Sequence, residues 1–581
     1  MASETFHKSQ TEEQNFHSKA LSVQASDSQK AAREHDSEVN EEGPIKGDMS
    51  DGRVDWTFKQ VAATIALCGL YVGSQIPLYF TGGALTFIAA DVGGIERVSW
   101  VPVSYSLAFS ALSPFSGYIQ DIFGRRNITL AGGCIVVIGN IIMATAHSFV
   151  QACVAMVITG AGASVGELTA LAGMSELVPV RKRGVYLAIV TFTIFPFTPY
   201  VIYCQLLSAY HTWRWLYYIC IMFNSISLVG IAVFYFPVSQ TRAAGQSTRI
   251  ILKQIDAGGA ALSITGLTLV LVALSAGGQS HAWTSAYVLC ILIIGFILLG
   301  AFAVWEWKLA KFPIIPHDMF SGQRVVAMAL VICFVAGMGL FAVTTFFPLL
   351  YSTVFPADPV QVGLRTLAPS MANNIGAIVC NTSLSLFKKR NREVLLIATI
   401  IMTAFTGSLA SITPDTSTRA IILGTFSSLG VGGIIVPAAT VAVIATPDTS
   451  IATCVALTLC IRQVGGAIGT AIYYNVLQNK LKTQLPAMVA KYAIAAGLPT
   501  NSTQLFVATF LTTPEDAATL PGVNNAILNG AALGSRWAYA NSFKYVWYVS
   551  VGFGIGAIIA CCFLGNTSRF HTNRIAGAVK A

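Results

Sequence analysis

Residues 117–126 read Gly117-Tyr-Ile-Gln-Asp121-Ile-Phe-Gly124-Arg125-Arg126 and separate two apolar stretches, residues 99–118 and 128–147. Each stretch has the length of about 20 residues that an α-helix needs to cross the hydrocarbon core of a bilayer. The charged segment between them is therefore predicted to be a short loop at one membrane surface. Gly117 allows a neighbouring helix to approach closely, and Gly124 allows the chain to turn tightly.

Apolar windows of the same length recur along the chain. We count fourteen predicted spans, at residues 61–84, 99–118, 128–147, 150–174, 184–208, 215–236, 257–276, 283–305, 325–350, 361–386, 394–412, 420–445, 451–477 and 545–565. The 581 residues are 54% hydrophobic and only 10% charged, whereas a soluble domain carries roughly 25% charged residues. The composition excludes a water-soluble enzyme or nucleic-acid-binding protein and predicts an all-α membrane protein.

The sequence also suggests an internal repeat. Residues 123–127 (Phe-Gly-Arg-Arg-Asn) follow the second span, and residues 387–391 (Phe-Lys-Lys-Arg-Asn) follow the tenth. Two six-helix halves related by a parallel repeat would place these segments at equivalent loops. The predicted organisation is a first half at 57–240, an inserted helix pair with cytosolic linkers at 241–323, and a second half at 324–568 that includes an extracellular loop at 478–544.

Charge predicts the orientation of these spans. Basic clusters occupy alternate loops, whereas the opposite short loops hold only Arg97, Arg214 and Arg419. By the positive-inside rule, both termini are cytosolic. Residues 1–56 hold twelve acidic and six basic residues and are predicted to be a disordered cytosolic tail, and 569–581 form a second tail. The 478–544 loop is then extracellular, and its Asn501-Ser-Thr sequon makes Asn501 a glycosylation candidate.

The opening segment resembles the G-x-L-a-D-r-x-G-r-k signature of the major facilitator superfamily. The matching residues are Gly117, Asp121, Gly124, Arg125 and Arg126. A carboxylate at a helix end can pair with guanidinium groups and with the positive end of a facing helix. We therefore predict that these five residues form a gating latch on the cytosolic side. The alternative is that they are ordinary positive-inside loop charges.

Two ionisable residues fall at membrane depth. Glu167 follows a run of small residues in the span 150–174, and Arg462 begins a segment that resembles the R-x-x-G-g-x-x-G-x-A pattern of fourteen-span drug:H⁺ antiporters. A charged group is costly inside a membrane, so it normally faces a partner or a cavity. Both are candidates for proton or substrate coupling. The arginine of the superfamily's antiporter signature is replaced here by Met156.

The span 184–208 combines aromatic residues with two prolines that should bend it. Its candidate substrate-cavity residues are Phe192, Phe195, Pro196, Pro199, Tyr200 and Gln205. Packing in the core or against lipid explains the aromatic residues equally well.

The run from Glu167 to Gly184, with these prolines, most resembles the fungal trichothecene efflux pump family, which groups with fungal siderophore-iron transporters. The resemblance implies a major facilitator fold and a monomeric plasma-membrane carrier that exports a bulky secondary metabolite, mycotoxin or xenobiotic by proton antiport. A ferric siderophore importer driven by proton symport is the alternative, and a transport-like sensor is a third. The sequence has no ATP-binding G-x-x-x-x-G-K-[ST] motif, and we expect no metal, cofactor, nucleic-acid partner or enzymatic activity.

Overall fold

The computed structural model describes residues 56–93, 100–238, 256–278, 280–310, 313–316, 319–320, 324–356, 358–571 and 578–579. This part of the chain is almost entirely helical, which confirms the predicted fold class. The strands β1 (Pro237–Val238) and β2 (Ala578–Val579) pair antiparallel and join the end of the first half to the C-terminal segment. The predicted tail at 1–56 lies outside the described residues except for Trp56, as do the linker 239–255 and most of the tail 569–581.

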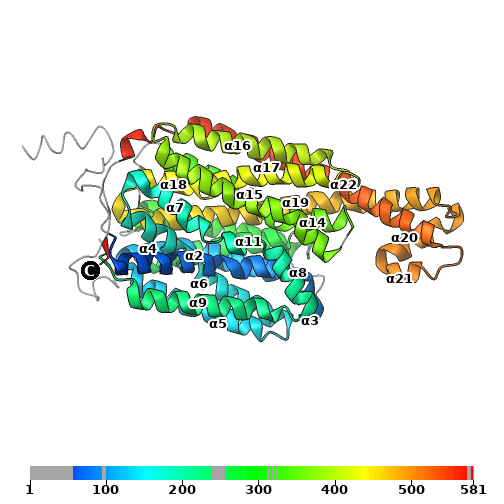
Figure 1. Ribbon diagram of the computed structural model, residues 1–581, viewed down its shortest axis with the longest axis horizontal. Coiled ribbons are helices and arrows are strands. Elements are labelled where there is room, and N and C mark those ends of the chain that lie inside the picture. Colours follow the sequence, from blue (N-terminus) through cyan, green and yellow to red (C-terminus); the bar gives the residue numbers. More distant parts are fainter. Residues whose placement is uncertain are drawn as a thin grey trace, which may run out of the picture.

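The first half is a bundle whose helices run back and forth between two ends of the molecule (Figure 1). Its helices are α2 (Phe58–Gly83), α3 (Leu85–Val92), α4 (Trp100–Phe123), α5 (Arg125–Ala144), α6 (Phe149–Leu177), α7 (Arg183–Phe192), α8 (Tyr200–Tyr210) and α9 (Arg214–Phe234).

The second half repeats this arrangement, and its last two helices are longer than any in the first half. It contains α13 (Val325–Phe341), α14 (Phe347–Thr353), α15 (Pro359–Leu386), α16 (Asn391–Ser408), α17 (Ser417–Ile435), α18 (Pro437–Ala445), α19 (Ile451–Ala495) and α22 (Asn525–Phe563). The two echoed segments of the sequence fall at equivalent loops, between α4 and α5 and between α15 and α16.

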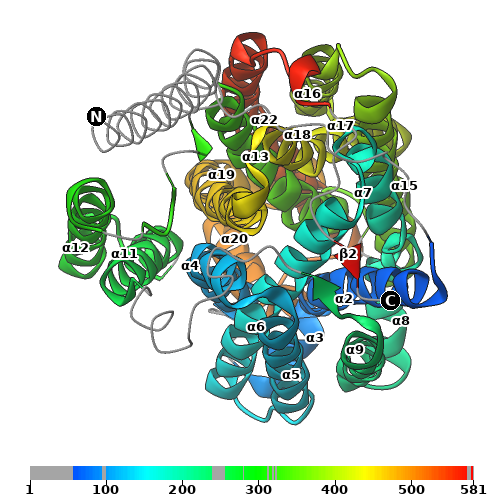
Figure 2. The same ribbon diagram turned by 90° about the vertical axis from the view of Figure 1, so that its left-hand side faces the viewer.

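The inserted pair, α11 (Ala257–Ala276) and α12 (Ala286–Val304), lies beside the two halves, where α11 packs against both α4 and α19 (Figure 2). Trp283 donates a hydrogen bond to Asn475 Oδ1 at 3.0 Å, and Asn475 Nδ2 donates to the Gly277 carbonyl at 3.2 Å. The pair is therefore attached to the second half at one end as well as along its side.

Twelve helical segments of the described chain are long and apolar enough to cross a membrane. Two predicted spans, in α4 and α15, are missing from that set, although these helices have 24 and 28 residues. Both are rich in small polar residues and pack against the other half, α4 on α19 and α15 on α7 and α8. Polar groups buried between the halves lower the hydropathy of a span. The total of fourteen remains a prediction.

Several predicted spans are broken rather than continuous. The span 184–208 ends its first helix at Phe192, passes through a 3₁₀ turn at Phe195–Phe197 and resumes at Tyr200. Pro196 and Pro199 lie in this break because proline lacks the N–H that a continuous helix requires. In the second half, a π-helical turn at Ala342–Phe346 separates α13 from α14.

The prediction of a long loop at 478–544 was wrong. Helix α19 continues to Ala495 and α22 begins at Asn525, so that the two extend beyond the bundle and carry α20 (Thr503–Thr512) and α21 (Pro514–Ala517) between them (Figure 1). This helical extension has its own apolar core, which includes Val489, Phe506 and Ile527. A search for apolar windows of bilayer length misses amphipathic helices, which pack together through a narrow apolar stripe on one face of each.

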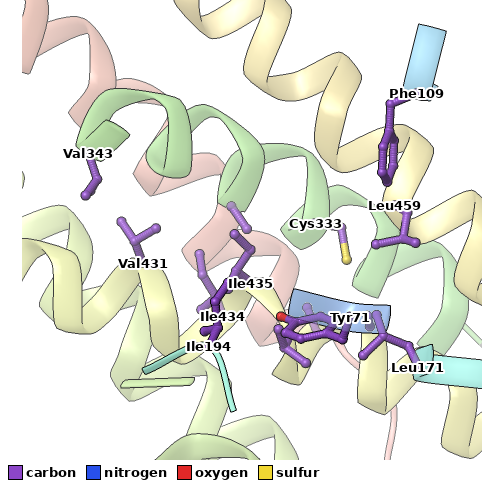
Figure 3. Close-up of a cluster of buried hydrophobic side chains, with 14 of the residues drawn as sticks. Tyr71, Phe109, Leu171, Ile194, Cys333, Val343, Val431, Ile434, Ile435 and Leu459 are labelled. Carbon is purple, nitrogen blue, oxygen red and sulfur yellow. The ribbon is translucent and has the colours of Figure 1, made fainter. Parts of the chain in front are cut away.

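The main core runs across the contact between the halves. Its cluster of buried side chains includes Tyr71 and Leu171 of the first half and Cys333 of the second (Figure 3). We call the end of the bundle that holds the loops 124 and 387–390 the basic end, and the end that carries the helical extension the projecting end.

Candidate transport site and gates

At the basic end, a carboxylate of the first half binds a helix of the second. Asp121, near the end of α4, is buried, and its Oδ2 accepts hydrogen bonds from Thr453 N at 3.0 Å and Thr453 Oγ1 at 2.7 Å. Thr453 lies in the first turn of α19, where free backbone N–H groups and the helix dipole favour an anion. The carboxylate therefore joins the two halves directly.

The glycines of the same segment fit close contacts. A Cβ on Gly117 would lie 2.6 Å from Ala456 Cβ and 2.9 Å from the Ala452 carbonyl oxygen, so only glycine permits this approach of α4 to α19. Gly124 has φ +86°, a conformation that glycine adopts without strain, and it turns the chain from α4 into α5.

The two arginines of the predicted latch have different surroundings. Arg125 Nη2 lies 3.8 Å from Asp121 Oδ1 and forms a close ion pair with Glu176 of α6. Arg126 instead donates to the Ala232 carbonyl at 2.9 Å and stacks its guanidinium 4.1 Å from the Phe236 ring centroid. The structure thus places Arg125 in the Asp121 cluster and Arg126 against the end of α9, inside the first half.

A second contact between the halves was missed by the sequence analysis. Arg183, fully buried at the start of α7, donates to the Ser175 carbonyl of α6 at 2.7 Å and to the Val443 carbonyl of α18 at 3.2 Å. Its Nη2 lies 3.6 Å from Asp448 Oδ1. Arg183 belongs to a basic cluster that the sequence explained by membrane topology alone, so only its burial distinguishes it from its neighbours.

Glu167 of α6 and Arg462 of α19 form a buried ion pair between the halves. Arg462 Nη2 donates to Glu167 Oε1 at 2.8 Å and to Oε2 at 3.0 Å. Gln75 Nε2 of α2 donates to the same Oε1 at 3.3 Å. The Glu167 carboxylate therefore keeps its charge partner only while α6 and α19 stay together.

A cavity of about 390 Å³ lies between the halves, toward the projecting end. Its walls come from α2, α8 and the start of α4 on one side, and from α13, α14, α15 and the π-helical turn on the other. Most of the lining is apolar, and none of the residues that line it is charged. Its polar residues are Tyr79, Tyr200, Gln205, Thr344, Thr345 and Ser352.

Two of the six predicted cavity residues, Tyr200 and Gln205, line this space. The other four, Phe192, Phe195, Pro196 and Pro199, are absent from its walls, and Phe192 is 57% exposed on the outside of the bundle, where it stacks on Phe195. The 3₁₀ turn changes the helical phase between α7 and α8, so Phe192 lies on the outside of the bundle whereas Tyr200 and Gln205 reach the cavity. Tyr79 and Phe341, which line the cavity from other spans, carried no sequence signal that separates them from core residues.

The projecting end contains the glycosylation candidate Asn501 and an ion pair between Asp91 and Arg214. Asn501 lies in an exposed 3₁₀ turn of the helical extension. On α3, partial burial raises the pKa of the Asp91 carboxyl, but hydrogen bonds from Trp213 at 3.0 Å and Arg214 at 2.6 Å outweigh it and lower that pKa. Asp91 thus fixes α3 to the start of α9 as a carboxylate.

Comparison with known proteins agrees with this architecture. A model of the family described as fungal trichothecene efflux pump matches residues 47–580. The chain belongs to the fungal trichothecene efflux pump family. Its relatives include the trichothecene efflux pump of Fusarium sporotrichioides, 24% identical over 526 residues that cover 89% of this chain and 87% of that protein.

Other relatives of this protein are also named as transporters. A transporter of the acurin A biosynthesis cluster of Aspergillus aculeatus is 28% identical over 505 residues, covering 84% of this chain and 86% of that protein. Among solved structures, the proton:xylose symporter XylE superposes with a TM-score of 0.52 at 12% identity, covering 87% of this chain and 96% of that one. The fold is that of the major facilitator superfamily, and the protein is a multi-span membrane transporter.

Proposed function

We propose that this protein exports a bulky secondary metabolite, mycotoxin or xenobiotic from the cytosol across the plasma membrane, as a monomer that exchanges it for protons. The basic end is then cytosolic. In this scheme the cavity holds the cargo, and the Asp121 and Arg183 contacts close the cytosolic gate while the cavity faces outward.

The ion pair between Glu167 and Arg462 carries this proposal. It joins α6 to α19, and its carboxylate is the one titratable acid that the described chain places both at mid-bundle and between the halves. Protonation would remove the charge of Glu167 and leave Arg462 without its counter-ion. Tyr79 is linked to Glu167 through Gln75, because the Tyr79 hydroxyl donates to Gln75 Oε1 at 3.0 Å and Gln75 Nε2 donates to Glu167 Oε1 at 3.3 Å.

One observation supports export, and a second supports the proposed kind of cargo. Several relatives are named as efflux pumps, among them a trichothecene efflux pump of Fusarium sporotrichioides and an MFS-type efflux pump of a Fusarium species. The cavity between the halves also has an apolar lining without charged side chains, which suits an uncharged apolar cargo.

The test is net transport in cells that lack this protein and in matched cells that express it, with a trichothecene and several ferric siderophores as probes. We expect lower trichothecene content in the expressing cells, and we expect that content to rise when the proton gradient is collapsed. Increased iron-siderophore content would instead identify an importer and refute export.

Proton coupling is tested separately with Glu167→Gln. This variant keeps hydrogen-bonding atoms but not the charge, and we expect gradient-driven efflux to fall by about tenfold or more because the pair is buried. Asp516→Asn, an exposed position on the helical extension, is the matched control and should transport normally. Unchanged transport and pH dependence in a normally expressed Glu167→Gln protein would exclude Glu167 as the coupling group.

A further inference from the structure

The cavity has a second, smaller chamber. This annex has a volume of about 20 Å³ and shares Tyr79, Tyr200, Leu340 and Thr344 with the larger chamber. Its other lining residues are Thr198, Val343, Ser370, Asn373 and Asn374, so that seven of its nine lining residues carry a polar side-chain group and none is charged. An apolar chamber that ends in a polar pocket suits an uncharged molecule with a greasy body and one oxygenated edge.

Two neighbouring asparagines line the annex, and they differ in their hydrogen bonds. Asn374 Nδ2 donates to Thr198 Oγ1 at 2.9 Å, a contact between α15 and the break before α8. The neighbouring Asn373 Oδ1 is buried and makes no hydrogen bond. The Asn373 amide is therefore not fixed by a hydrogen bond to its oxygen, and rotation of this amide would present the acceptor to a ligand group in the annex.

A chain of hydrogen bonds leads from the annex to the ion pair. Tyr79, which lines both chambers, donates from its hydroxyl to Gln75 Oε1 at 3.0 Å. Gln75 is one turn earlier on α2, and its Nε2 donates to Glu167 Oε1 at 3.3 Å. The Tyr79 ring is held in place by stacking on Tyr200, with ring centroids 5.2 Å apart. The Gln75 amide accepts a hydrogen bond from Tyr79 and donates one to Glu167, so a change in the first bond can alter the second.

We infer that the annex is the hydrogen-bonding subsite for the cargo, with Asn373 as its specificity-determining acceptor, and that Tyr79 and Gln75 are positioning residues that transmit occupancy to the Glu167–Arg462 pair. This inference rests on the proposed transport function. When a cargo oxygen accepts a hydrogen bond from the Tyr79 hydroxyl, that hydroxyl no longer donates to Gln75. The Gln75 amide is then free to turn, Glu167 loses a donor, and the pair that holds α6 to α19 weakens when the cavity is filled.

The experiment uses the full-length protein in proteoliposomes, with a hydroxylated trichothecene and its deoxy analogue as probes. Two fluxes are measured for each: uphill transport driven by an imposed pH gradient, and exchange of labelled for unlabelled probe without a gradient. The variants are Tyr79→Phe, which keeps the ring but loses the donor, Gln75→Met, which keeps the shape but loses the amide, and Asn373→Leu.

We expect Tyr79→Phe and Gln75→Met to retain exchange but to lose about tenfold of uphill transport, the effect of one buried hydrogen bond. The double variant should be no worse than either single one because both act in one chain. We expect Asn373→Leu to raise KM about tenfold for the hydroxylated probe and to leave KM for the deoxy analogue unchanged. The control Leu349→Ala, in the apolar chamber, should raise KM for both probes alike and keep uphill transport at saturation.

The outcomes distinguish failure of the proposed transport function from failure of the roles assigned to the annex, Tyr79 and Gln75. Absence of uphill transport in the wild-type protein would overturn the proposed function. Uphill transport that survives in Tyr79→Phe and Gln75→Met, or exchange and uphill transport lost together, would overturn the transmission role. Equal effects of Asn373→Leu on both probes would overturn the assignment of the annex.

Discussion

At the residue scale, the charges that the sequence singled out are those with buried partners. Asp121, Glu167 and Arg462 each contact the opposite half. The sequence singled out all three because burying a charge at a helix end or in a span is costly unless the charge has a partner. Their partners were less accessible to sequence reasoning. Thr453 acts through its place in the first turn of α19, and Arg183 resembles the neighbouring basic residues until its burial is known.

The Asp121 contact leads to a prediction for the gate at the basic end. Asp121→Ala removes two hydrogen bonds to a charged acceptor, each worth about 1.5–3 kcal/mol, from the closed state alone. We expect the basic end to open more often, because the open state does not contain these bonds. In a variant that retains only Cys454, next to Thr453, the rate of maleimide labelling should rise about tenfold or more.

The control for this measurement is Asp516→Ala in the same single-cysteine background, which leaves the gate intact. A Cys454 labelling rate in Asp121→Ala equal to that of the control would show that Asp121 does not hold the gate closed.

At the element scale, the sequence predicted the positions of the long apolar helices, but not the helices of the extension or the 3₁₀ turn within the span 184–208. Each predicted apolar window overlaps a helix of the described chain, although only twelve helical segments reach the hydropathy of a span, and four of the six candidate cavity residues in the span 184–208 do not line the cavity. Tyr200 and Gln205 face the cavity and Phe192 does not, although the sequence presents all three on equally apolar helices. Which face of a span meets a cavity depends on its neighbours, and one sequence does not specify these.

Close packing of α13 on α19 gives a prediction at this scale. A Cβ on Gly465 would lie 2.0 Å from the Phe334 carbonyl oxygen, which is backbone and cannot move aside. Gly465→Val should therefore force the helices apart and lower stability by about 1–3 kcal/mol. The measurement is the thermal unfolding midpoint of the purified protein in detergent.

Gly556→Val is the matched control, because nothing lies within 4 Å of the position that its Cβ would occupy. We expect its unfolding midpoint to stay at the wild-type value. Similar midpoints for the two variants would mean that α13 and α19 are not packed as closely as described.

At the scale of the whole molecule, the two ends of the bundle differ in kind. At the basic end, Asp121 and Arg183 bind the second half directly, whereas the projecting end holds the cavity between the halves. The helical extension adds a folded unit to that end, built on α19, the same helix that carries Thr453 and Arg462 (Figure 1). One continuous helix thus connects the gate, the ion pair and the extension, so tilting of α19 would move all three together.

The orientation of the molecule gives the final prediction. If the basic end is cytosolic, the extension is exposed to the secretory lumen during synthesis, and Asn501 in its exposed turn can receive a glycan. The sequon at Asn127, exposed near the start of α5, then lies on the cytosolic side and stays unmodified. In a eukaryotic host, we expect Asn501→Gln to abolish the mobility shift that endoglycosidase treatment produces, and Asn127→Gln to leave that shift intact. A shift that depends on Asn127 would reverse the orientation, place the Asp121 gate outside and require the opposite assignment of the closed end in the transport cycle.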